Sequence, residues 1–160
     1  MGEEWVLDAS PYILFARIGR LDILRGLAAV IVIPNAVIGE VRAGMAIDPS
    51  AQAALEWGVP FASHDVVLPP SVISWDLGAG ESQVVAQCVE TDKWAVLDDR
   101  MGRRCATAHN VPVIGSLGII LRAKRFGLID LARPWIEMMI SHGIYVAENV
   151  VRDVLAAVGE

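Results

Sequence analysis

Short apolar runs alternate with amphipathic segments along this chain. Four runs have the length and apolar character of buried strands, and they cover Trp5–Asp8, Val30–Ile33, Trp94–Leu97 and Val111–Ile114. Between them, apolar residues recur at the spacing of a helix that buries one face. This alternation is typical of folds in which parallel strands form a central sheet and helices cover its faces. The pattern therefore predicts an α/β fold with a central parallel sheet.

Start and stop signals divide the amphipathic segments into separate helices. Ser10 and Pro11 are strong start signals, with Ser as the N-cap and Pro at the first helical position. The stretch from residue 61 to residue 74 is the least regular, and Val66–Leu68 is a candidate minor edge strand within it. The further predicted helices cover Leu21–Arg25, Ala36–Arg42, Asp48–Gly58, a segment opening at Gly80–Ser82, a segment from Asp99 to about His109, Gly115–Phe126, Ala132–Ser141 and Ala147–Val158.

Acidic residues recur where a strand or loop is followed by a helix. They are Asp8, Glu40, Glu81, Asp98 and Asp99. Because the functional crevice of an open α/β sheet lies at the carboxyl ends of its strands, we expect these acids to share one cluster. Crowded carboxylates repel each other unless a divalent cation lies between them. The simplest interpretation is a site for a hard metal ion and metal-assisted hydrolysis of a phosphodiester.

The first two acids also have structural explanations. Asp8 could be the N-cap of the following helix, although Ser10 already has that role in the prediction. Glu40 considered alone is best explained as a surface residue paired with Arg17 or Arg42. The position of Asp8 after three apolar residues favours a functional role. A functional role for Glu40 is supported only by the presence of the other acids.

The later acids have alternatives of the same kind. Glu81 in a first helical turn would complement the helix dipole. The preceding Gly78–Gly80 suggests a close backbone approach, but no phosphate-binding glycine fingerprint follows. Asp98 and Asp99 are adjacent, so one could cap the next helix while the other faces a metal.

Composition adds limits to this picture. The chain has 160 residues, enough for one domain over residues 1–160, and is 54% hydrophobic. Its mean hydropathy of +0.49 is high, yet no apolar run is long enough to cross a membrane. The apolar excess therefore suggests buried parallel strands and a homodimer or higher homo-oligomer interface. The absence of a signal peptide, together with Cys88 and Cys105 as two buried thiols, indicates a cytoplasmic protein.

Charge is unevenly distributed. The net charge of −6 argues against a generic nucleic-acid binder driven by charge. Between residues 100 and 125, however, there are six basic residues and no acid: Arg100, Arg103, Arg104, Arg122, Lys124 and Arg125. They could form a basic wall that holds phosphates beside the acidic cluster, or they could be solvated helix faces. The sequence does not favour one of these explanations.

Several motifs together resemble the PIN-domain superfamily. In chain order they are residues 6–10 (VLDAS), 33–41 (IPNAVIGEV), 78–86 (GAGESQVVA) and 96–104 (VLDDRMGRR). Residues 111–129 (VPVIGSLGIILRAKRFGLI) resemble more narrowly the PIN-like branch of predicted nucleic-acid-binding proteins. The resemblance implies a three-layer α/β/α PIN-like (Rossmann-like) sandwich and a ribonuclease site dependent on Mg²⁺ or Mn²⁺, often in toxins of toxin–antitoxin pairs.

The resemblance also implies roles for individual residues. Asp8 matches the first acid of the family, Glu40 the second, and Asp98 or Asp99 the later acid at a strand end. Glu81 falls where many members carry Asp, and Ser10 matches a small polar residue near the metal. This chain departs from the pattern at residues 101–103, where members usually have a further Asp.

The leading functional hypothesis is a metal-dependent endoribonuclease, acting as the toxin of a pair with a small antitoxin protein. The acids would hold Mg²⁺ or Mn²⁺, and Arg100, Arg103 and Arg104 would orient the RNA backbone. One alternative is a catalytically weak nucleic-acid-binding or assembly protein that keeps the PIN fold. Another is a hydrolase of small phosphate compounds on a similar fold.

Overall fold

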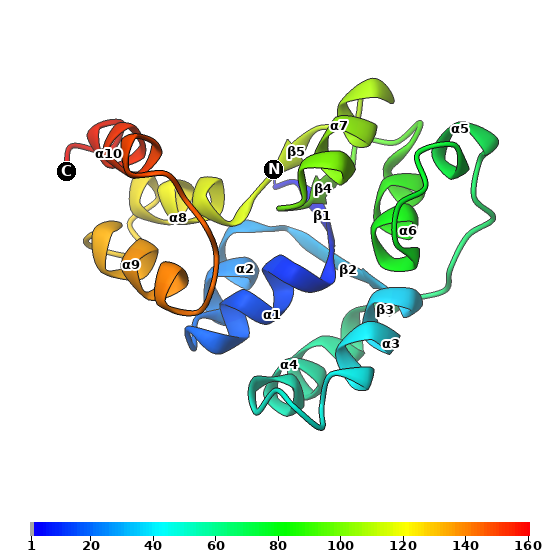
Figure 1. The fold of residues 1–160 in the computed structure, drawn as a ribbon, viewed down its shortest axis with the longest axis horizontal. Helices are drawn as coiled ribbons and strands as arrows, with labels where there is room; N and C mark the ends of the chain where they lie inside the picture. The colour runs from blue at the N-terminus through cyan, green and yellow to red at the C-terminus, as the bar shows by residue number, and fades with distance from the viewer. Residues whose placement is uncertain (1) are drawn as a thin grey trace.

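A five-stranded parallel sheet lies at the centre of the computed structural model, which describes residues 2–160 (Figure 1). The strands are β1 (Glu4–Leu7), β2 (Val30–Pro34), β3 (Ala62–Ser63), β4 (Trp94–Val96) and β5 (Val113–Ile114), in the order β3-β2-β1-β4-β5. β1 is central, with Val6 opposite Val32 on one side and Ala95 on the other. The prediction of a central parallel sheet is confirmed.

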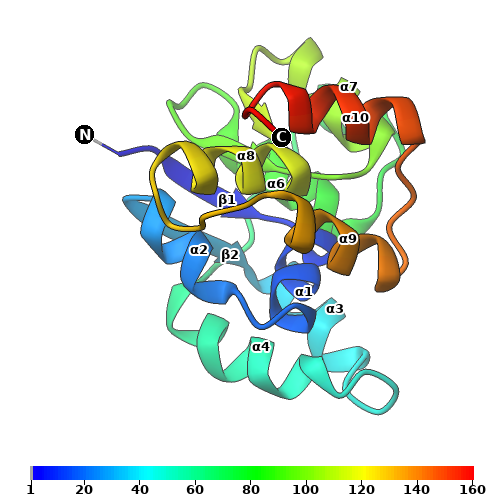
Figure 2. The ribbon, with the colours of Figure 1, turned by 90° about the vertical axis from the view of Figure 1, so that its left-hand side faces the viewer.

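Helices cover both faces of this sheet, which gives the predicted three-layer α/β/α arrangement. They are α1 (Ala9–Arg17), α2 (Leu21–Leu27), α3 (Asn35–Ala43), α4 (Ser50–Gly58), α5 (Pro70–Ile73), α6 (Ala79–Cys88), α7 (Arg100–Ala108), α8 (Ser116–Arg125), α9 (Arg133–Ser141) and α10 (Glu148–Ala156), with a 3₁₀ turn at Val59–Phe61. α1, α2 and α8 lie on one side of the sheet and α6 on the other (Figure 1). Figure 2 shows α9 and α10 outside α8.

The central strand explains why the sequence is so apolar. Trp5, Val6 and Leu7 are all fully buried, because helices cover both sides of β1. Full burial of such a side chain stabilises the fold by about 1.5–3 kcal/mol. Cys88 and Cys105 are free thiols within the same core, as predicted. None of the helices in residues 2–160 has the length and apolar character needed to cross a bilayer.

The predicted edge strand is wrong. Val67 is 95% exposed, and the edge strand β3 lies earlier, where Ala62 pairs with Ile33 of β2. Val66 is held instead by the side chain of Gln83, which accepts from its N–H and donates to its carbonyl oxygen, both at 2.8 Å. A side chain from α6 therefore takes the place of a neighbouring strand. This partner is distant in the sequence, so local pattern could not reveal it.

The start of α1 also differs from the prediction. The helix begins at Ala9, and Asp8 occupies the N-cap position, whereas Ser10 is an exposed residue within the helix. The N–H of Asp8 donates to the carbonyl oxygen of Val96 at 3.1 Å, so Asp8 still belongs to the sheet. Its side chain does not cap the helix. The Asp8 carboxylate is therefore available for another role.

Candidate active site

The order of the strands brings the predicted acids to one edge of the sheet. β1 and β4 are neighbours, so Asp8, the first residue after β1, lies beside Asp98, the second residue after β4. Glu40 comes from α3, which begins directly after β2. Glu81 lies in the first turn of α6, which contacts both α3 and β1. The carboxyl edge of the sheet is therefore acidic, as the sequence predicts.

Asp8 is the most buried of these acids. It is only 3% exposed, and its Oδ1 atom is the one buried side-chain polar atom in residues 2–160 without a hydrogen-bond partner. The pKa of Asp8 is raised from its ordinary value of 3.8 to about 7. Burial is the largest cause, and the negative charges of Glu81, Glu40 and Asp98 act in the same direction. A hydrogen bond from the backbone of Ala9 lowers the pKa in part, but no positively charged side chain offsets the burial of this carboxylate.

Glu81 connects the remaining acids to Asp8. Its pKa is also raised, first by burial, then by the charges of Asp99 and Glu40 and by a hydrogen bond with the side chain of Asp99. Together with the neighbours of Asp8, this links all five predicted acids in one network of mutual repulsion. We refer to Asp8, Glu40, Glu81, Asp98 and Asp99 as the acidic cluster.

Glu40 is held by backbone rather than by a cation. Its Oε1 atom accepts from the N–H of Gly80 at 2.9 Å. Arg17 forms its ion pair with Asp48 instead, at 2.7 Å. Arg42 forms no ion pair within the part of the chain that the structure describes. Glu40 is exposed on α3, as the structural alternative required, but the predicted pair with Arg17 or Arg42 is wrong.

Asp98 and Asp99 have separate roles, as the sequence suggested. Asp99 is the N-cap of α7, where its Oδ2 atom accepts from the N–H of Gly102 at 2.9 Å. Asp98 accepts twice from Ser116, from the N–H at 2.7 Å and from the hydroxyl at 2.5 Å. Ser116 is buried at the start of α8 and was missed by the sequence analysis. A serine that opens a helix directly after a predicted strand was the available signal.

Three glycines allow the acids to lie against backbone. A Cβ on Gly80 would be 2.6 Å from Oε1 of Glu40, and one on Gly115 would be 2.9 Å from Oδ1 of Asp98. A Cβ on Gly102 would be 3.3 Å from Oε2 of Glu81. Gly80 and Gly102 in the first turns of α6 and α7, and Gly115 between β5 and α8, thus allow close approach to carboxylates.

A cleft of about 680 Å³ opens beside the cluster. Ser10, Glu40, Asp98 and Asp99 line it, together with residues 142–145 from the connection between α9 and α10. Asp8 and Glu81 are not among its lining residues. The contribution of residues 142–145 was missed, because nothing in the sequence places this distant connection beside α1 and α3.

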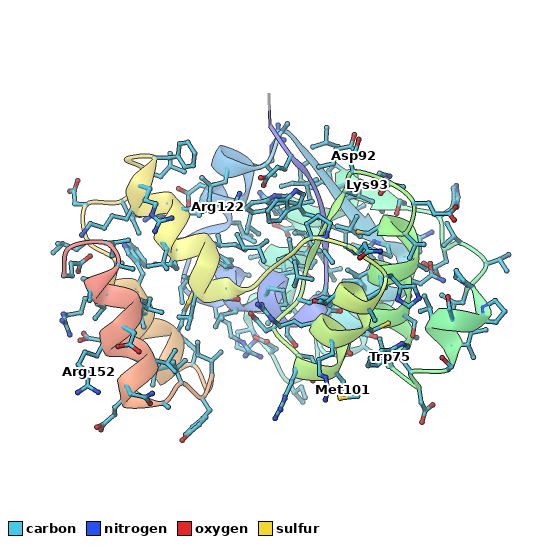
Figure 3. The ribbon with its side chains drawn as sticks, turned by 90° about the horizontal axis from the view of Figure 1, so that it is seen from above. Trp75, Asp92, Lys93, Met101, Arg122 and Arg152 are labelled. Atoms are coloured by element: carbon cyan, nitrogen blue, oxygen red, sulfur yellow. The ribbon has the colours of Figure 1, made fainter. Side chains whose placement is uncertain are left out.

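The proposed basic wall does not exist as one surface. Arg122 pairs with Glu3, and Lys124 pairs with Glu160, each at 2.7 Å. The three arginines of α7 are placed differently, because Arg100, Arg103 and Arg104 line a hollow of about 610 Å³ that also includes Asp98. Figure 3 shows Arg122 on the side of the molecule opposite Met101 of α7. The three α7 arginines therefore share a hollow with Asp98 of the acidic cluster, whereas Arg122 and Lys124 are paired elsewhere.

Comparison with known proteins agrees with this arrangement. A family model described as a PIN domain matches residues 4–160. The chain belongs to the PIN-domain family. The predicted membership is confirmed, and the parallel sheet with helices on both faces is the fold expected of a PIN domain. No curated protein matches the chain.

Membership in the PIN-domain family makes a divalent metal the relevant group to test against the site, since PIN domains are generally nucleases and typically use such metals. Within residues 2–160, no three Asp, Glu, His or Cys side chains converge on one point closely enough to ligate an ion. The chemistry of the donors fits, because carboxylate oxygens are the ligands that Mg²⁺ and Mn²⁺ prefer. The unpartnered Oδ1 of Asp8 fits as well.

Proposed function

We propose that this PIN domain is a metal-dependent endoribonuclease that hydrolyses RNA phosphodiesters at the acidic cluster. The observation that carries the proposal is Asp8, a buried carboxylate with one unpartnered oxygen and only acids as charged neighbours. A buried charge of this kind destabilises the fold unless a cation neutralises it. Buried ionisable groups with shifted pKa values are found most often at functional sites. In a family of nucleases, the corresponding function of Asp8 would be metal binding.

The residues of the cluster have distinct tasks in this proposal. Asp8, Glu40, Glu81, Asp98 and Asp99 would hold Mg²⁺ or Mn²⁺. A metal held there would supply an activated water molecule and charge neutralisation at the transferring phosphate. Ligand orientation comes from the chain itself, because the Ser116 hydroxyl fixes Asp98 and the Gly80 N–H fixes Glu40.

RNA binding involves the residues around the cluster. Ser10 lies in the cleft beside Glu40 and would contact the substrate there. Arg100, Arg103 and Arg104 would pair with phosphates of the backbone. These three arginines form no ion pairs within the described residues, so their charge is free for a ligand.

The test is cleavage of a panel of single-stranded and structured RNAs with Mg²⁺, Mn²⁺ or EDTA. We expect cutting with either metal and none with EDTA. Glu40→Gln removes one ligand charge and should lower the rate about 10²-fold. The matched control is Glu137→Gln, because Glu137 is exposed on α9, away from the cluster. Equal cleavage by Glu40→Gln and Glu137→Gln would refute the assigned site.

A second candidate is a catalytically weak binder that keeps the fold. It is favoured by Asp99, which is already engaged as the cap of α7, and by residues 101–103, where no further acid follows. RNA binding without cleavage by any metal on the panel would support it. The proposal has further parts. Residues 1–160 form one domain, and the chain associates as a homodimer or higher homo-oligomer. The protein is a toxin that a small partner protein inhibits.

A pair of glycine variants tests how Glu40 is positioned. Gly80→Ala introduces a Cβ only 2.6 Å from Oε1 of Glu40, so the carboxylate must shift away from the Gly80 N–H. We expect Mn²⁺ affinity to fall about tenfold, the usual effect of losing a partner that orients a ligand. Isothermal titration calorimetry measures this change.

The matched control is Gly39→Ala in α3. Nothing lies within 4 Å of a Cβ at Gly39, so this change should leave Mn²⁺ affinity unaltered. It should instead raise the free energy of unfolding by about 0.5–1 kcal/mol, because alanine is more stable than glycine in the interior of a helix. The same Mn²⁺ affinity in both variants would show that the Gly80 contact does not position Glu40.

A further inference from the structure

The exposed side of α7 carries three arginines. Arg100, Arg103, Arg104, Thr107 and Ala108 follow one another at the helical spacing that places residues on one side. The opposite side is buried in the core through Gly102, Cys105 and Ala106. Burial of that side fixes the rotation of the helix, so the arginines are presented at the surface as a set. We call Arg100, Arg103 and Arg104 the arginine face.

Trp75 completes the hollow in front of the arginine face. It is partly exposed and lies after α5, near the carboxyl edge of the sheet. Figure 3 shows Trp75 and Met101 of α7 on the same side of the molecule, away from Arg122 and Lys93. An aromatic ring beside free arginines combines a stacking surface with positive charge.

Trp75 differs from the other four tryptophans. Each of the others has a specific partner: Trp5 donates to Glu3, Trp57 packs on Tyr12 and Phe61, Arg20 lies over Trp135, and Arg122 lies over Trp94. Among the described residues, no aromatic ring or cation of this kind contacts the Trp75 ring. Trp75 packs against the core, but it is partly exposed and lines the hollow, so the exposed part of its ring can contact a ligand.

The position of Trp75 relative to α7 is fixed by hydrogen bonds and burial. The Ser71 hydroxyl in α5 lies 2.9 Å from Nε2 of His109, and His109 is the C-cap of α7. Val72 of the same short helix is fully buried. The N–H of Trp75 donates to the carbonyl oxygen of Val72 at 3.1 Å, which ties the residue to this anchored turn. The hollow therefore lies between segments whose relative positions are held by hydrogen bonds and by burial.

The hollow also connects to the acidic cluster. Asp98 lines both the hollow and the 680 Å³ cleft. Arg103 lies at the junction, because its guanidinium donates to the carbonyl oxygen of Leu97 at 3.1 Å. A strand of nucleic acid at the cluster would therefore extend directly into the hollow.

We propose that Trp75 and the arginine face bind one unpaired nucleotide of the substrate, with Trp75 stacking on its base and the arginines holding its phosphates. This inference rests on the proposed function and adds to it a site for one unpaired nucleotide, formed by Trp75 and the arginine face. Bases in a duplex are stacked on each other and cannot offer a face to Trp75, whereas an unpaired base can. Stacking accepts every base, so the hollow selects strandedness rather than sequence.

The test is binding of a fluorescent single-stranded RNA and of the matching RNA duplex, measured by anisotropy in EDTA so that no cleavage occurs. Trp75→Leu keeps an apolar side chain against the core but removes the aromatic face. It should weaken binding of the single strand roughly 10- to 100-fold and leave duplex binding unchanged. Trp75→Phe, which keeps an aromatic face, should remain within about threefold of the unmodified protein.

The matched control is Trp135→Leu, the same chemical change at a ring that lies outside the hollow and under Arg20. It should not alter RNA binding. Thermal denaturation checks that each variant is folded. An equal loss for single strand and duplex in Trp75→Leu, or no measurable single-strand binding by the unmodified protein, would overturn the inference.

Arg104→Ala gives a second readout if Trp75→Leu does not fold. Loss of one phosphate contact should reduce the slope of log K against log salt by about 0.7 for a single strand. Arg152→Ala is its control, because Arg152 is exposed on α10 at a distance from the hollow (Figure 3). An unchanged slope in Arg104→Ala would contradict the phosphate role.

Cleavage assays with Mn²⁺ separate this inference from the proposed function. Binding that depends on Trp75 without metal-dependent cleavage would refute the nuclease and keep the nucleotide site. Metal-dependent cleavage together with RNA binding that does not change in Trp75→Leu would refute the nucleotide site and support the nuclease.

Discussion

Asp8→Asn is expected to lower the rate of RNA cleavage about 10²- to 10³-fold, the usual effect of removing one preorganised charge from an active site. Asparagine has nearly the same shape as aspartate but lacks the charge that would hold a metal. The change is measured as kcat on the best RNA from the panel, at saturating Mn²⁺. Asp153→Asn is the matched control, because Asp153 is exposed on α10.

The same variant should be at least as stable as the unmodified protein. Asp8 is buried among other acids, so replacement by a neutral group relieves repulsion in the absence of metal. Circular dichroism melting in EDTA at pH 8 measures this effect. Cleavage that survives in Asp8→Asn would remove Asp8 from the mechanism. Loss of the fold would instead make Asp8 a structural residue.

The second large effect is a dependence of stability on pH without metal. The pKa of Asp8 is about 7 in the folded protein, against an ordinary value of 3.8. Because the folded state favours the protonated form, the stabilisation is complete below pH 3.8 and is lost as the pH rises to about 7. The gap between these pKa values corresponds to about 4 kcal/mol, an upper bound for one group. Above pH 7 the contribution of Asp8 should be constant.

Urea denaturation in EDTA at several pH values between 4 and 8 measures this loss. Glu81 titrates with the same sign, since its pKa is also raised, so the contribution of Asp8 is the difference between the unmodified protein and Asp8→Asn. That difference should grow from pH 4 to pH 7. Added Mn²⁺ should restore stability in the unmodified protein at pH 8 and have less effect on Asp8→Asn. A constant difference across the pH range would show that Asp8 is not buried as a charged group.

The acids illustrate how far local pattern reaches into function. Asp8, Glu40, Glu81 and the pair Asp98–Asp99 could all be found by their positions after strands or at helix starts. Their convergence followed from one rule, that the carboxyl ends of parallel strands share an edge. The partners that hold them could not be found in this way. Ser116 and Gly80 meet their acids across large sequence separations, through packing of α8 and α6.

The cationic residues show the opposite case. Six of them without an acid between residues 100 and 125 looked like one basic surface. The fold divides them, because α7 and α8 follow different strands and face different neighbours. Arg122 and Lys124 meet acids near the two ends of the chain, Glu3 and Glu160, and so are neutralised. Charge density along a sequence says little about charge density on a surface.

The sequence by itself determined the parallel α/β fold, the places of the main strands and helices, the membership in the PIN-domain family and the identity of the acids. These depend on periodicity and on short motifs, which are properties of neighbouring residues. Only the tertiary structure decided that Asp8 has an unpartnered buried oxygen, that Gln83 replaces a strand at Val66, and that Trp75 lies before the arginine face. Burial and hydrogen-bond partners depend on which distant segments pack together, and that is settled by the whole fold.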